Sequence, residues 1–216
     1  MSEHFQTVDP FQFDMSIERG KIQSFTSGGY KRYLITEDGI SPRVLPGLPG
    51  AMYVSASDEH DEAGVVISDV LAGLPSSLEI RNKIHAKRMK KLDVMRAEDM
   101  RLPTLTGPAD AEITLMGWGS TYDAIEEAVQ YCANEGLLVN HLHVTDLFPL
   151  PVEGVLEILN SCREIVAIEN NFSSQMTRLI RSETGYHIKR TVNRYDGEPF
   201  TGEDIFKRLK RGLSYV

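Results

Sequence analysis

The sequence contains only two cysteines, Cys132 and Cys162, among its 216 residues. Two thiols cannot build a disulfide framework and are too few to hold an iron–sulfur cluster, so we expect reduced cysteines in a cytoplasmic protein. The longest apolar runs, such as Ile165–Ile168, are far too short to span a membrane, and no signal-peptide pattern opens the chain. These absences exclude a disulfide-stabilised secreted domain and predict no association with a membrane.

Positive charge is also in short supply. The chain has 23 Lys and Arg against 31 Asp and Glu, which gives a formal net charge of −8. That balance argues against general nucleic-acid binding. The hydrophobic content of 41% is ordinary for a soluble globular protein, and the length allows one large domain or two small ones.

One segment reverses the charge balance. Residues 77–101 contain no Gly or Pro and carry eight basic side chains against four acidic ones, Glu79, Asp93, Glu98 and Asp99. Helix formers dominate, so the segment predicts an exposed linking helix of roughly 20 residues, with Ser76 or Ser77 as N-cap and Pro103 beyond its end. Its basic face is either simply solvated or docks on an acidic partner or anionic ligand.

The C-terminal half alternates between strand and helix patterns. Strands are predicted at 112–116, 137–144, 164–168 and 187–192, and helical spacing of apolar residues follows each. The predicted inward positions are Ile125, Ala128, Val129 and Cys132 in the first helix, Val155, Ile158 and Leu159 in the second, Phe172, Met176, Leu179 and Ile180 in the third, and Ile205, Phe206 and Leu209 in the last. This rhythm predicts an α/β fold with a doubly wound, mostly parallel sheet over 108–216.

The first 75 residues lack such a rhythm. Glycines and prolines crowd the segment, and only 31–36 and 64–68 are expected to form short strands. The segment is typical of the tail of a larger domain. We therefore expect three parts, namely 1–75, a basic linking helix and linker at 76–107, and the α/β domain at 108–216.

A glycine-containing turn follows the first strand of that domain. Gly117 and Gly119 precede a helix that Ser120 is expected to cap, so backbone N–H groups there could hold an anion. A dinucleotide fingerprint is excluded because Tyr122 stands where the third glycine belongs. The alternative is a tight turn required only by the chain path.

Two other groups of polar residues contain side chains of the types that bind metal ions. Asp58–Glu62 places four carboxylates around one imidazole but lacks calcium-loop spacing, so an acidic loop or a contact with another chain is favoured. His141 and His143 face the same side of a strand, yet no further zinc ligands stand at motif spacing. Glu169–Asn171 either forms hydrogen bonds above the sheet or caps the next helix.

The motifs taken together resemble the alpha subunit of 2-oxoacid:ferredoxin oxidoreductases, most closely the 2-oxoglutarate type, over nearly the whole chain. The residues that carry this resemblance occur in order, as Tyr33, Thr36-Glu-Asp-Gly-Ile-Ser-Pro-Arg43, Pro46-Gly47, Asp58-Glu-His-Asp-Glu62 with Gly64, Lys87-Arg88 and Lys91, Gly117-Trp-Gly-Ser-Thr121, Pro149 and Pro151, Glu169 with Asn171 and Gln175, and Tyr195-Asp-Gly197 with Pro199-Phe200. Ser174 departs from the family, in which a glycine commonly precedes the glutamine.

The resemblance implies a thiamine-diphosphate enzyme that converts a 2-oxoacid and CoA into an acyl-CoA and CO2 and passes electrons through iron–sulfur clusters to ferredoxin. In this family a pyrimidine-type domain precedes a transketolase C-terminal-like domain, and the diphosphate and Mg2+ belong to the beta subunit. The sequence lacks the Tyr-Pro-Ile-Thr-Pro type segment of the substrate region and the glutamate that activates the cofactor. Residues 1–75 would then be the remnant of the pyrimidine-type domain, and the chain a C-terminal portion of the subunit.

On this resemblance we expect a structural and subunit-interface role, with beta and other subunits as partners. We assign no catalytic, cofactor-binding or metal-binding residue, and none of the cofactors is expected to bind this chain alone. The residues expected at an interface or on the approach to the active site are Ser41, Arg43, Glu59, His60, Lys87 and Arg88. The alternative function is a stand-alone α/β module that binds an anion at the Gly117–Ser120 turn, and the same family with pyruvate or a branched-chain substrate is a third hypothesis.

Overall fold

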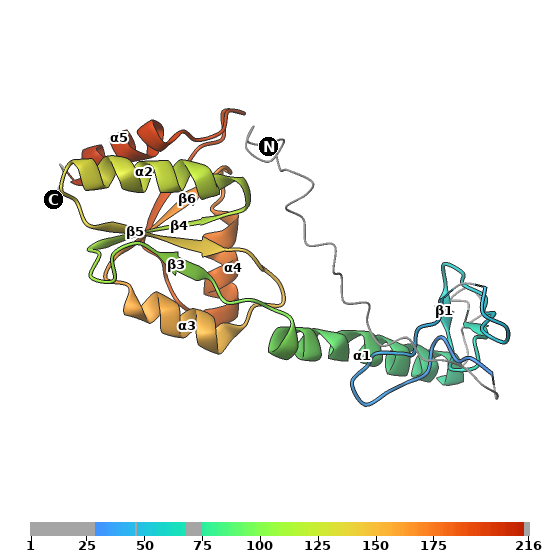
Figure 1. Cartoon of the computed structure of the whole chain (residues 1–216). Helices are drawn as coiled ribbons and strands as arrows, with labels where there is room; N and C mark the ends of the chain where they lie inside the picture. Colours follow the sequence, from blue (N-terminus) through green and yellow to red (C-terminus); the bar gives the residue numbers. More distant parts are fainter. Residues whose placement is uncertain (1–28, 46, 68–74, 214–216) are drawn as a thin grey trace. The chain divides into compact units, whose positions relative to one another are not determined.

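The computed structural model describes residues 29–45, 47–67 and 75–213, which fall into two compact units divided between Asp99 and Met100. We call them the N-terminal unit and the C-terminal unit (Figure 1). The N-terminal unit contains β1 (Glu59–His60), β2 (Val66–Ile67) and α1 (Pro75–Glu98). The C-terminal unit contains β3 (Thr104–Thr106), β4 (Ile113–Trp118), α2 (Tyr122–Asn134), β5 (Val139–Val144), α3 (Val152–Ser161), β6 (Ile165–Glu169), α4 (Gln175–Thr184), β7 (Arg190–Asn193) and α5 (Gly202–Leu213).

The C-terminal unit is built on a five-stranded sheet in the order β3-β5-β4-β6-β7. The pairs β4–β5, β4–β6 and β6–β7 are parallel, and only β3 runs antiparallel to its neighbour β5. The chain moves from β4 to β5 on one side and then returns to β6 on the other. The doubly wound, mostly parallel sheet predicted from the sequence is therefore confirmed, with the additional antiparallel edge strand β3.

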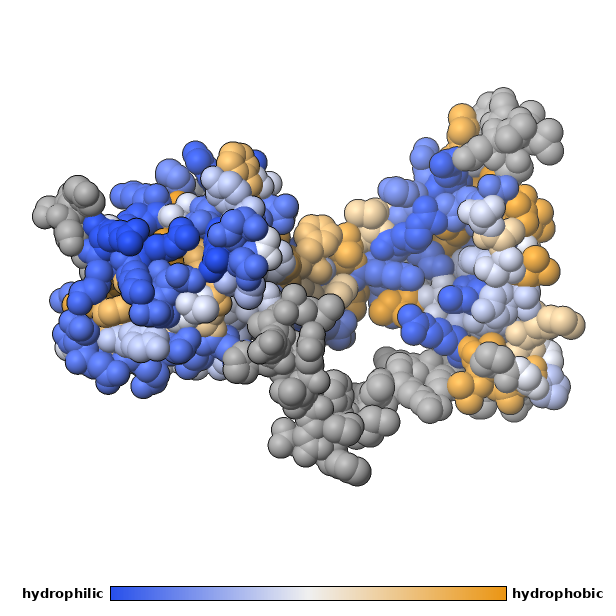
Figure 2. Space-filling view, turned by 90° about the horizontal axis from the view of Figure 1, so that it is seen from above, coloured by the Kyte–Doolittle hydropathy of each residue, from blue (hydrophilic) through white to orange (hydrophobic). Residues whose placement is uncertain are grey.

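Helices cover both faces of this sheet, which gives the unit two hydrophobic cores (Figure 1). On one face α2 and α5 bury Ile125, Ala128, Cys132, Ile205 and Leu209 against the strands. On the other face α3 and α4 bury Val155, Leu159, Met176 and Ile180. Figure 2 shows that the outward side of α2 and α5 is mainly hydrophilic, which is typical of amphipathic helices on a sheet.

Four local predictions for the elements are wrong. The helix α1 begins at Pro75, so neither Ser76 nor Ser77 is its N-cap, because proline already suits the first helical position. A 3-10 turn at Gly119–Thr121 precedes α2, and Thr121 rather than Ser120 is the N-cap. Phe172 lies before α4 and is 75% exposed rather than inward. Residues 31–36 form turns rather than a strand.

The N-terminal unit has little regular structure apart from α1. Strands β1 and β2 pair antiparallel over two residues each, and β1 packs against α1. Exposed apolar side chains, among them Met52, Val54 and Val65, are spread over its surface, and apolar patches lie between hydrophilic ones in Figure 2. Such exposure is typical of a surface that is normally covered by other protein.

Candidate functional site

The first candidate site is a crevice at the carboxyl ends of β4 and β6, between which the winding of the sheet reverses. Ligands of open α/β sheets bind in crevices of this kind. The crevice has a volume of about 190 Å³ and is lined by Trp118, Gly119, Ser120 and Thr121 after β4 and by Asn170, Asn171 and Gln175 after β6. Two of the three predicted anion-turn residues, Gly119 and Ser120, thus lie in this crevice.

Gly117, the third predicted residue, has a different position because it lies inside β4. A Cβ atom there would stand 2.2 Å from Ile125 Cδ1 and 2.4 Å from Thr121 Oγ1, so the missing side chain lets α2 approach the strand. Thr121 Oγ1 accepts a hydrogen bond from Trp118 N at 3.0 Å and donates one to Trp118 O at 3.0 Å. Gly117 and Thr121 therefore fix the turn through packing and hydrogen bonding.

Glu169, the last residue of β6, precedes the crevice residues Asn170 and Asn171 and caps α4. Its fully buried carboxylate accepts hydrogen bonds from Met176 N at 3.0 Å, Thr177 N at 3.0 Å, Thr177 Oγ1 at 2.7 Å and Asn171 Nδ2 at 2.7 Å. The structure therefore shows Glu169 as a cap of the following helix, one of the two roles that the sequence allows for Glu169–Asn171. Because the carboxylate already compensates the positive end of the α4 dipole, α4 offers little attraction to a further anion.

The residue before α4 explains the departure at Ser174. Its φ is 53°, in the left-handed region that glycine adopts most easily. The hydroxyl of Ser174 donates to Asn193 Oδ1 at 3.2 Å, and Asn193 Nδ2 donates back to Ser174 Oγ at 3.0 Å. The position therefore keeps the backbone geometry of a glycine, with the serine held by the end of β7.

The second candidate site lies in the N-terminal unit, where the structure brings together five of the six residues predicted for an interface or an active-site approach. Lys87 Nζ of α1 donates a hydrogen bond to Ser41 Oγ, and Ser41 Oγ donates to Leu34 O at 3.0 Å. Both side chains are buried. Burial lowers the pKa of Lys87, and the neighbouring cations of Lys91 and Arg32 lower it further.

Gly39 makes this contact geometrically accessible. Its φ of +74° is one that L side chains rarely adopt, and a Cβ atom there would lie 2.6 Å from the Lys87 carbonyl oxygen. The loop that carries Ser41 therefore rests directly on α1. This is the physical reason for a glycine within the Thr36–Arg43 motif.

The other predicted residues of this site are also held by neighbours. Arg88 Nη1 lies 2.6 Å from Glu59 Oε1 and 2.5 Å from Glu59 Oε2. The imidazole of His60 is 2% exposed and stacks on Tyr33, with ring centroids 4.3 Å apart and an angle of 9° between the planes. Within the described residues His60 Nε2 has no hydrogen-bond partner. The predicted acidic loop thus supplies internal contacts of the N-terminal unit.

Arg43 is the predicted residue that stands apart from these pairs. It lines an open groove of about 900 Å³ together with Thr36, Glu37, Asp38, Ile40, Ser41, Pro42, Val94 and Glu98 of α1, and Asp99 just after α1. The groove combines one cation with four carboxylates beside the C-terminal end of a helix, where the dipole adds further negative potential. This surface is open to another molecule.

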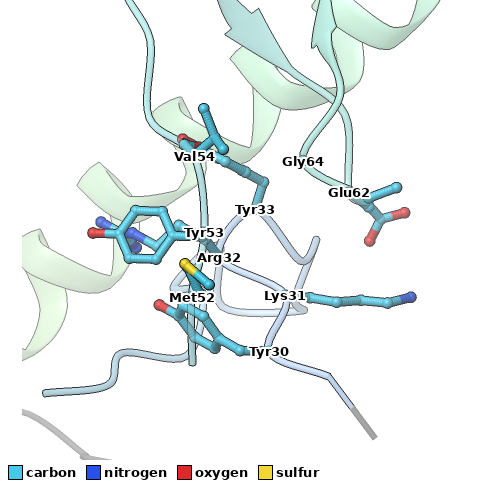
Figure 3. A pocket seen from close by; sticks show the side chains of 10 residues that line it. Tyr30, Lys31, Arg32, Tyr33, Met52, Tyr53, Val54, Glu62 and Gly64 are labelled. Atoms are coloured by element: carbon cyan, nitrogen blue, oxygen red, sulfur yellow. The ribbon is translucent and has the colours of Figure 1, made fainter. Parts of the chain in front are cut away.

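A smaller pocket of about 230 Å³ adjoins the His60 contact through Tyr33. Figure 3 shows Tyr30, Met52 and Tyr53 on one side of it and Lys31 and Glu62 on the other. Hydrogen bonds from Tyr30 OH to Pro42 O at 2.8 Å and from Tyr33 OH to Val54 O at 3.2 Å fix two of its rings. This pocket was not predictable from the sequence, because its lining comes from three separate segments, 30–33, 52–54 and 62–64, that no motif links.

The ion pairs of α1 change the interpretation of its charge. Besides Arg88 with Glu59, Lys83 pairs with Glu79 at 2.7 Å and Arg96 with Asp93 at 3.2 Å. Three of the seven basic side chains of α1 are therefore paired with carboxylates within the chain. The solvated face is the better interpretation of these residues.

The described part of the chain offers neither a metal centre nor a membrane span. No group of three or more His, Cys, Asp or Glu side chains in it is placed to hold a metal ion. No helix within the same residues is long and apolar enough to cross a bilayer. Cys132 is buried in α2 and Cys162 follows α3, and both are free thiols.

The contribution of the Glu59–Arg88 ion pair to stability can be tested by mutation. We expect Glu59→Gln to lower the free energy of unfolding of the N-terminal unit by about 1 kcal/mol. The reason is that the Glu59 carboxylate is only 13% exposed and its hydrogen bonds with Arg88 are charge-assisted. The charge swap Glu59→Arg with Arg88→Glu should recover part of the loss. Hydrogen exchange of α1 amides in a double-mutant cycle measures the coupling. The Glu79–Lys83 pair on the same helix, 67% and 61% exposed, is the matched control and should show no measurable coupling.

The C-terminal unit matches a known protein family, and most of the chain is similar to a solved structure. Residues 111–205 match the family model described as pyruvate:ferredoxin oxidoreductase core domain II. This range contains the parallel strands β4, β5, β6 and β7 of the C-terminal unit. A solved 2-oxoglutarate:ferredoxin oxidoreductase from Magnetococcus marinus, with 2-oxoglutarate, coenzyme A and succinyl-CoA bound, superposes with a TM-score of 0.71 at 30% identity. The match covers 89% of this chain and 32% of that one. The C-terminal unit is therefore similar to this core domain, and its mostly parallel sheet is consistent with the transketolase C-terminal-like fold that the resemblance implies.

Curated relatives of this chain are subunits of oxidoreductases that act on 2-oxoacids. The alpha subunit of 2-oxoacid:ferredoxin oxidoreductase 2 of Aeropyrum pernix is 30% identical over 210 residues, 96% of this chain and 31% of the relative. The 2-oxoglutarate oxidoreductase subunit KorA of Mycobacterium tuberculosis is 26% identical, and the match covers 79% of this chain and 24% of the KorA chain. The resemblance to 2-oxoacid:ferredoxin oxidoreductase alpha subunits that the motifs indicated is confirmed by these relatives. It spans about a third of the length of the first relatives it matches.

Proposed function

We propose that this chain serves as part of the alpha subunit of a thiamine-diphosphate-dependent 2-oxoacid:ferredoxin oxidoreductase, in which it has a structural and subunit-interface role and no complete active site of its own. The observation that carries the proposal is the match of 89% of the chain, with a TM-score of 0.71, to a portion of a chain about three times as long. We propose 2-oxoglutarate as the substrate, since that solved relative binds it.

The contacts of the expected residues support this role. Ser41, Glu59, His60, Lys87 and Arg88 satisfy one another or pack inside the N-terminal unit. Side chains engaged in this way hold the loops on α1, whereas a catalytic group would need access to substrate. The exposed apolar side chains of the same unit and the groove at Arg43 are the surfaces left for other subunits.

The residue boundaries of the parts are also proposed. Residues 1–75 would be the remnant of the pyrimidine-type domain, 76–107 the helix and linker, and 108–216 the transketolase C-terminal-like domain. The packing of β1 on α1 supports a functional association of the first two parts. Residues 1–28 lie outside the described part of the chain.

The cofactors of the complex are proposed to be held by other chains. Thiamine diphosphate with Mg2+ and the iron–sulfur clusters need oxygen and thiolate ligands in groups. The described residues bring no such group together, and the two cysteines lie on different elements. The described residues 29–45, 47–67 and 75–213 therefore do not fit these groups. The proposed partners are the beta subunit, other subunits and, through the complex, ferredoxin, in the cytoplasm, with neither nucleic acid nor membrane.

Reconstitution tests this function. The full chain, co-expressed with a beta subunit of the family, should co-purify with it. Arg43→Glu should weaken that association about tenfold or more, because it reverses the charge inside the open groove. Arg163→Glu, the same change on an exposed arginine of the C-terminal unit, should have no comparable effect. Purified alone, the chain should not oxidise 2-oxoglutarate with an artificial electron acceptor, and measurable turnover by the chain alone would overturn the proposal.

A second function is an independent module that binds an anion in the crevice at Gly119 and Ser120. The position of the crevice at the switch point of the sheet favours it. The Glu169 carboxylate below the same crevice opposes it. Calorimetry with CoA, nucleotides and thiamine diphosphate separates the two functions, since only the second gives saturable binding to the chain alone.

A further inference from the structure

The C-terminal unit buries a histidine cluster that the proposed function does not use. We define the cluster as His141 and His143 of β5 with Tyr122 and Glu126 of α2. The two imidazoles project from the same face of β5, with ring centroids 5.5 Å apart. The Tyr122 ring lies over both, at centroid distances of 5.0 Å and 4.9 Å.

The hydrogen bonding of the cluster is one-sided. His141 Nδ1 lies 2.5 Å from Glu126 Oε1, which also accepts from Thr106 Oγ1 of β3 at 3.2 Å. Among the described residues, the buried His141 Nε2 and His143 Nδ1 have no hydrogen-bond partner. The carboxylate therefore orients His141 as the neutral tautomer with a proton on Nδ1, and a second proton on His141 Nε2 or a proton on His143 Nδ1 would have no acceptor among the described residues.

The cluster lies beside β3, a short edge strand of the sheet. Strand β3 is three residues long, pairs only with β5, and places Thr104 opposite His143 and Thr106 opposite His141. A short edge strand held on one side opens at a lower free energy than the central strands do. Release of β3 removes the cover from both imidazoles on that side.

We propose that the histidine cluster is an acid-sensitive latch, in which protonation of the buried imidazole pair releases β3 and the first turn of α2 from β5. Two imidazolium charges at this separation repel each other, and the repulsion is stronger in this partly buried site than in water. The groups that face the pair are Tyr122, Asp123 and Glu126 from α2 and only Thr104 and Thr106 from β3, while β4 presents Leu115 and Gly117 beside β5. Glu126 is already shared between His141 and Thr106, so His143 has the poorest compensation.

The titration of the rings agrees with this geometry. Burial and, second, the neighbouring His141 together lower the pKa of His143 to about 4, against the opposing charges of Asp123 and Glu126. Burial also lowers the pKa of His141, and Glu126 opposes that shift. A released ring regains an ordinary pKa near 6.5, so the open form binds protons more strongly and the closed form loses stability as the pH falls below that value.

The size of the effect follows from His143 alone. With a pKa of about 4 closed and about 6.5 open, opening becomes about 30-fold more favourable at pH 5 than at pH 8. Hydrogen exchange of the full chain, corrected for the intrinsic rate, should show this loss of protection at residues 104–106 and 141–143. The amides of 166–168 in the central strand β6 should keep their protection over the same range.

A matched pair of variants identifies the sensor. His143→Leu keeps an apolar contact with Tyr122 and should reduce the 30-fold change to a few-fold. His187→Leu makes the same chemical change at an exposed histidine away from the cluster and should leave the wild-type response. An NMR titration of the wild-type imidazoles is independent of how the variants fold. The proposal is overturned by a titration of His143 near 6.5, by equal loss of protection in β6, or by a full pH response in His143→Leu.

Discussion

Glu169→Ala should lower the free energy of unfolding of the C-terminal unit by about 4 kcal/mol. The substitution leaves four donors without their acceptor in a fully buried position, namely Met176 N, Thr177 N, Thr177 Oγ1 and Asn171 Nδ2. It also removes the negative charge that compensates the first turn of α4. The result would be a frayed start of α4 and a loss of the wall that holds Asn171.

Trp118 makes the measurement specific. It is the single tryptophan of the chain and lies partly buried at the end of β4, so its fluorescence in urea reports the C-terminal unit. Glu169→Gln keeps the shape and one acceptor oxygen, and about half the loss is expected. Glu164→Ala is the control, because that carboxylate pairs with Arg190 at a half-exposed position and should cost under about 1 kcal/mol. Equal losses at both positions would contradict the capping role.

Gly117→Ala is the second large effect, with an expected loss of about 2–3 kcal/mol. The new methyl group would stand 2.2 Å from Ile125 Cδ1 and 2.4 Å from Thr121 Oγ1. Neither atom can move easily, since Ile125 is fully buried and Thr121 Oγ1 holds both the N–H and the carbonyl of Trp118. The strand and α2 would have to separate.

A double-mutant cycle tests the contact directly. Ile125→Val deletes Cδ1, so in that background Gly117→Ala should cost about 1 kcal/mol less than in the wild type. Gly212→Ala is the control, because its methyl group would meet only the end of the flexible Arg190 side chain. Strict additivity of Gly117→Ala and Ile125→Val would show that the close approach of α2 is not what requires glycine.

The C-terminal unit was predictable from local pattern. The alternation of short apolar runs with helical spacing placed β4, β5, β6 and β7 to within a few residues, because buried parallel strands and amphipathic helices each leave a period in the sequence. Strand β3 left no such period. Its three residues, Thr-Leu-Thr, become a strand only because β5 offers a free edge.

The candidate sites divide in the same way. The motif around Gly39 and Arg43 was visible as an ordered loop, and the sequence indicated that Lys87 and Arg88 belong with it. Their partners were not predictable, since 46 residues separate Lys87 from Ser41 and 29 separate Arg88 from Glu59. Equally, nothing in the spacing of His141 and His143 showed that Tyr122 and Glu126 would close over them.

The sequence by itself indicated the family resemblance and the doubly wound sheet. Tertiary structure alone decided what the polar residues do. Glu169 became a helix cap, Gly117 a point of close packing, and the basic helix a set of compensated charges. The physical reason is that periodicity is a local property of the chain, whereas the role of a polar group depends on which distant donor, acceptor or charge the fold brings within hydrogen-bonding distance.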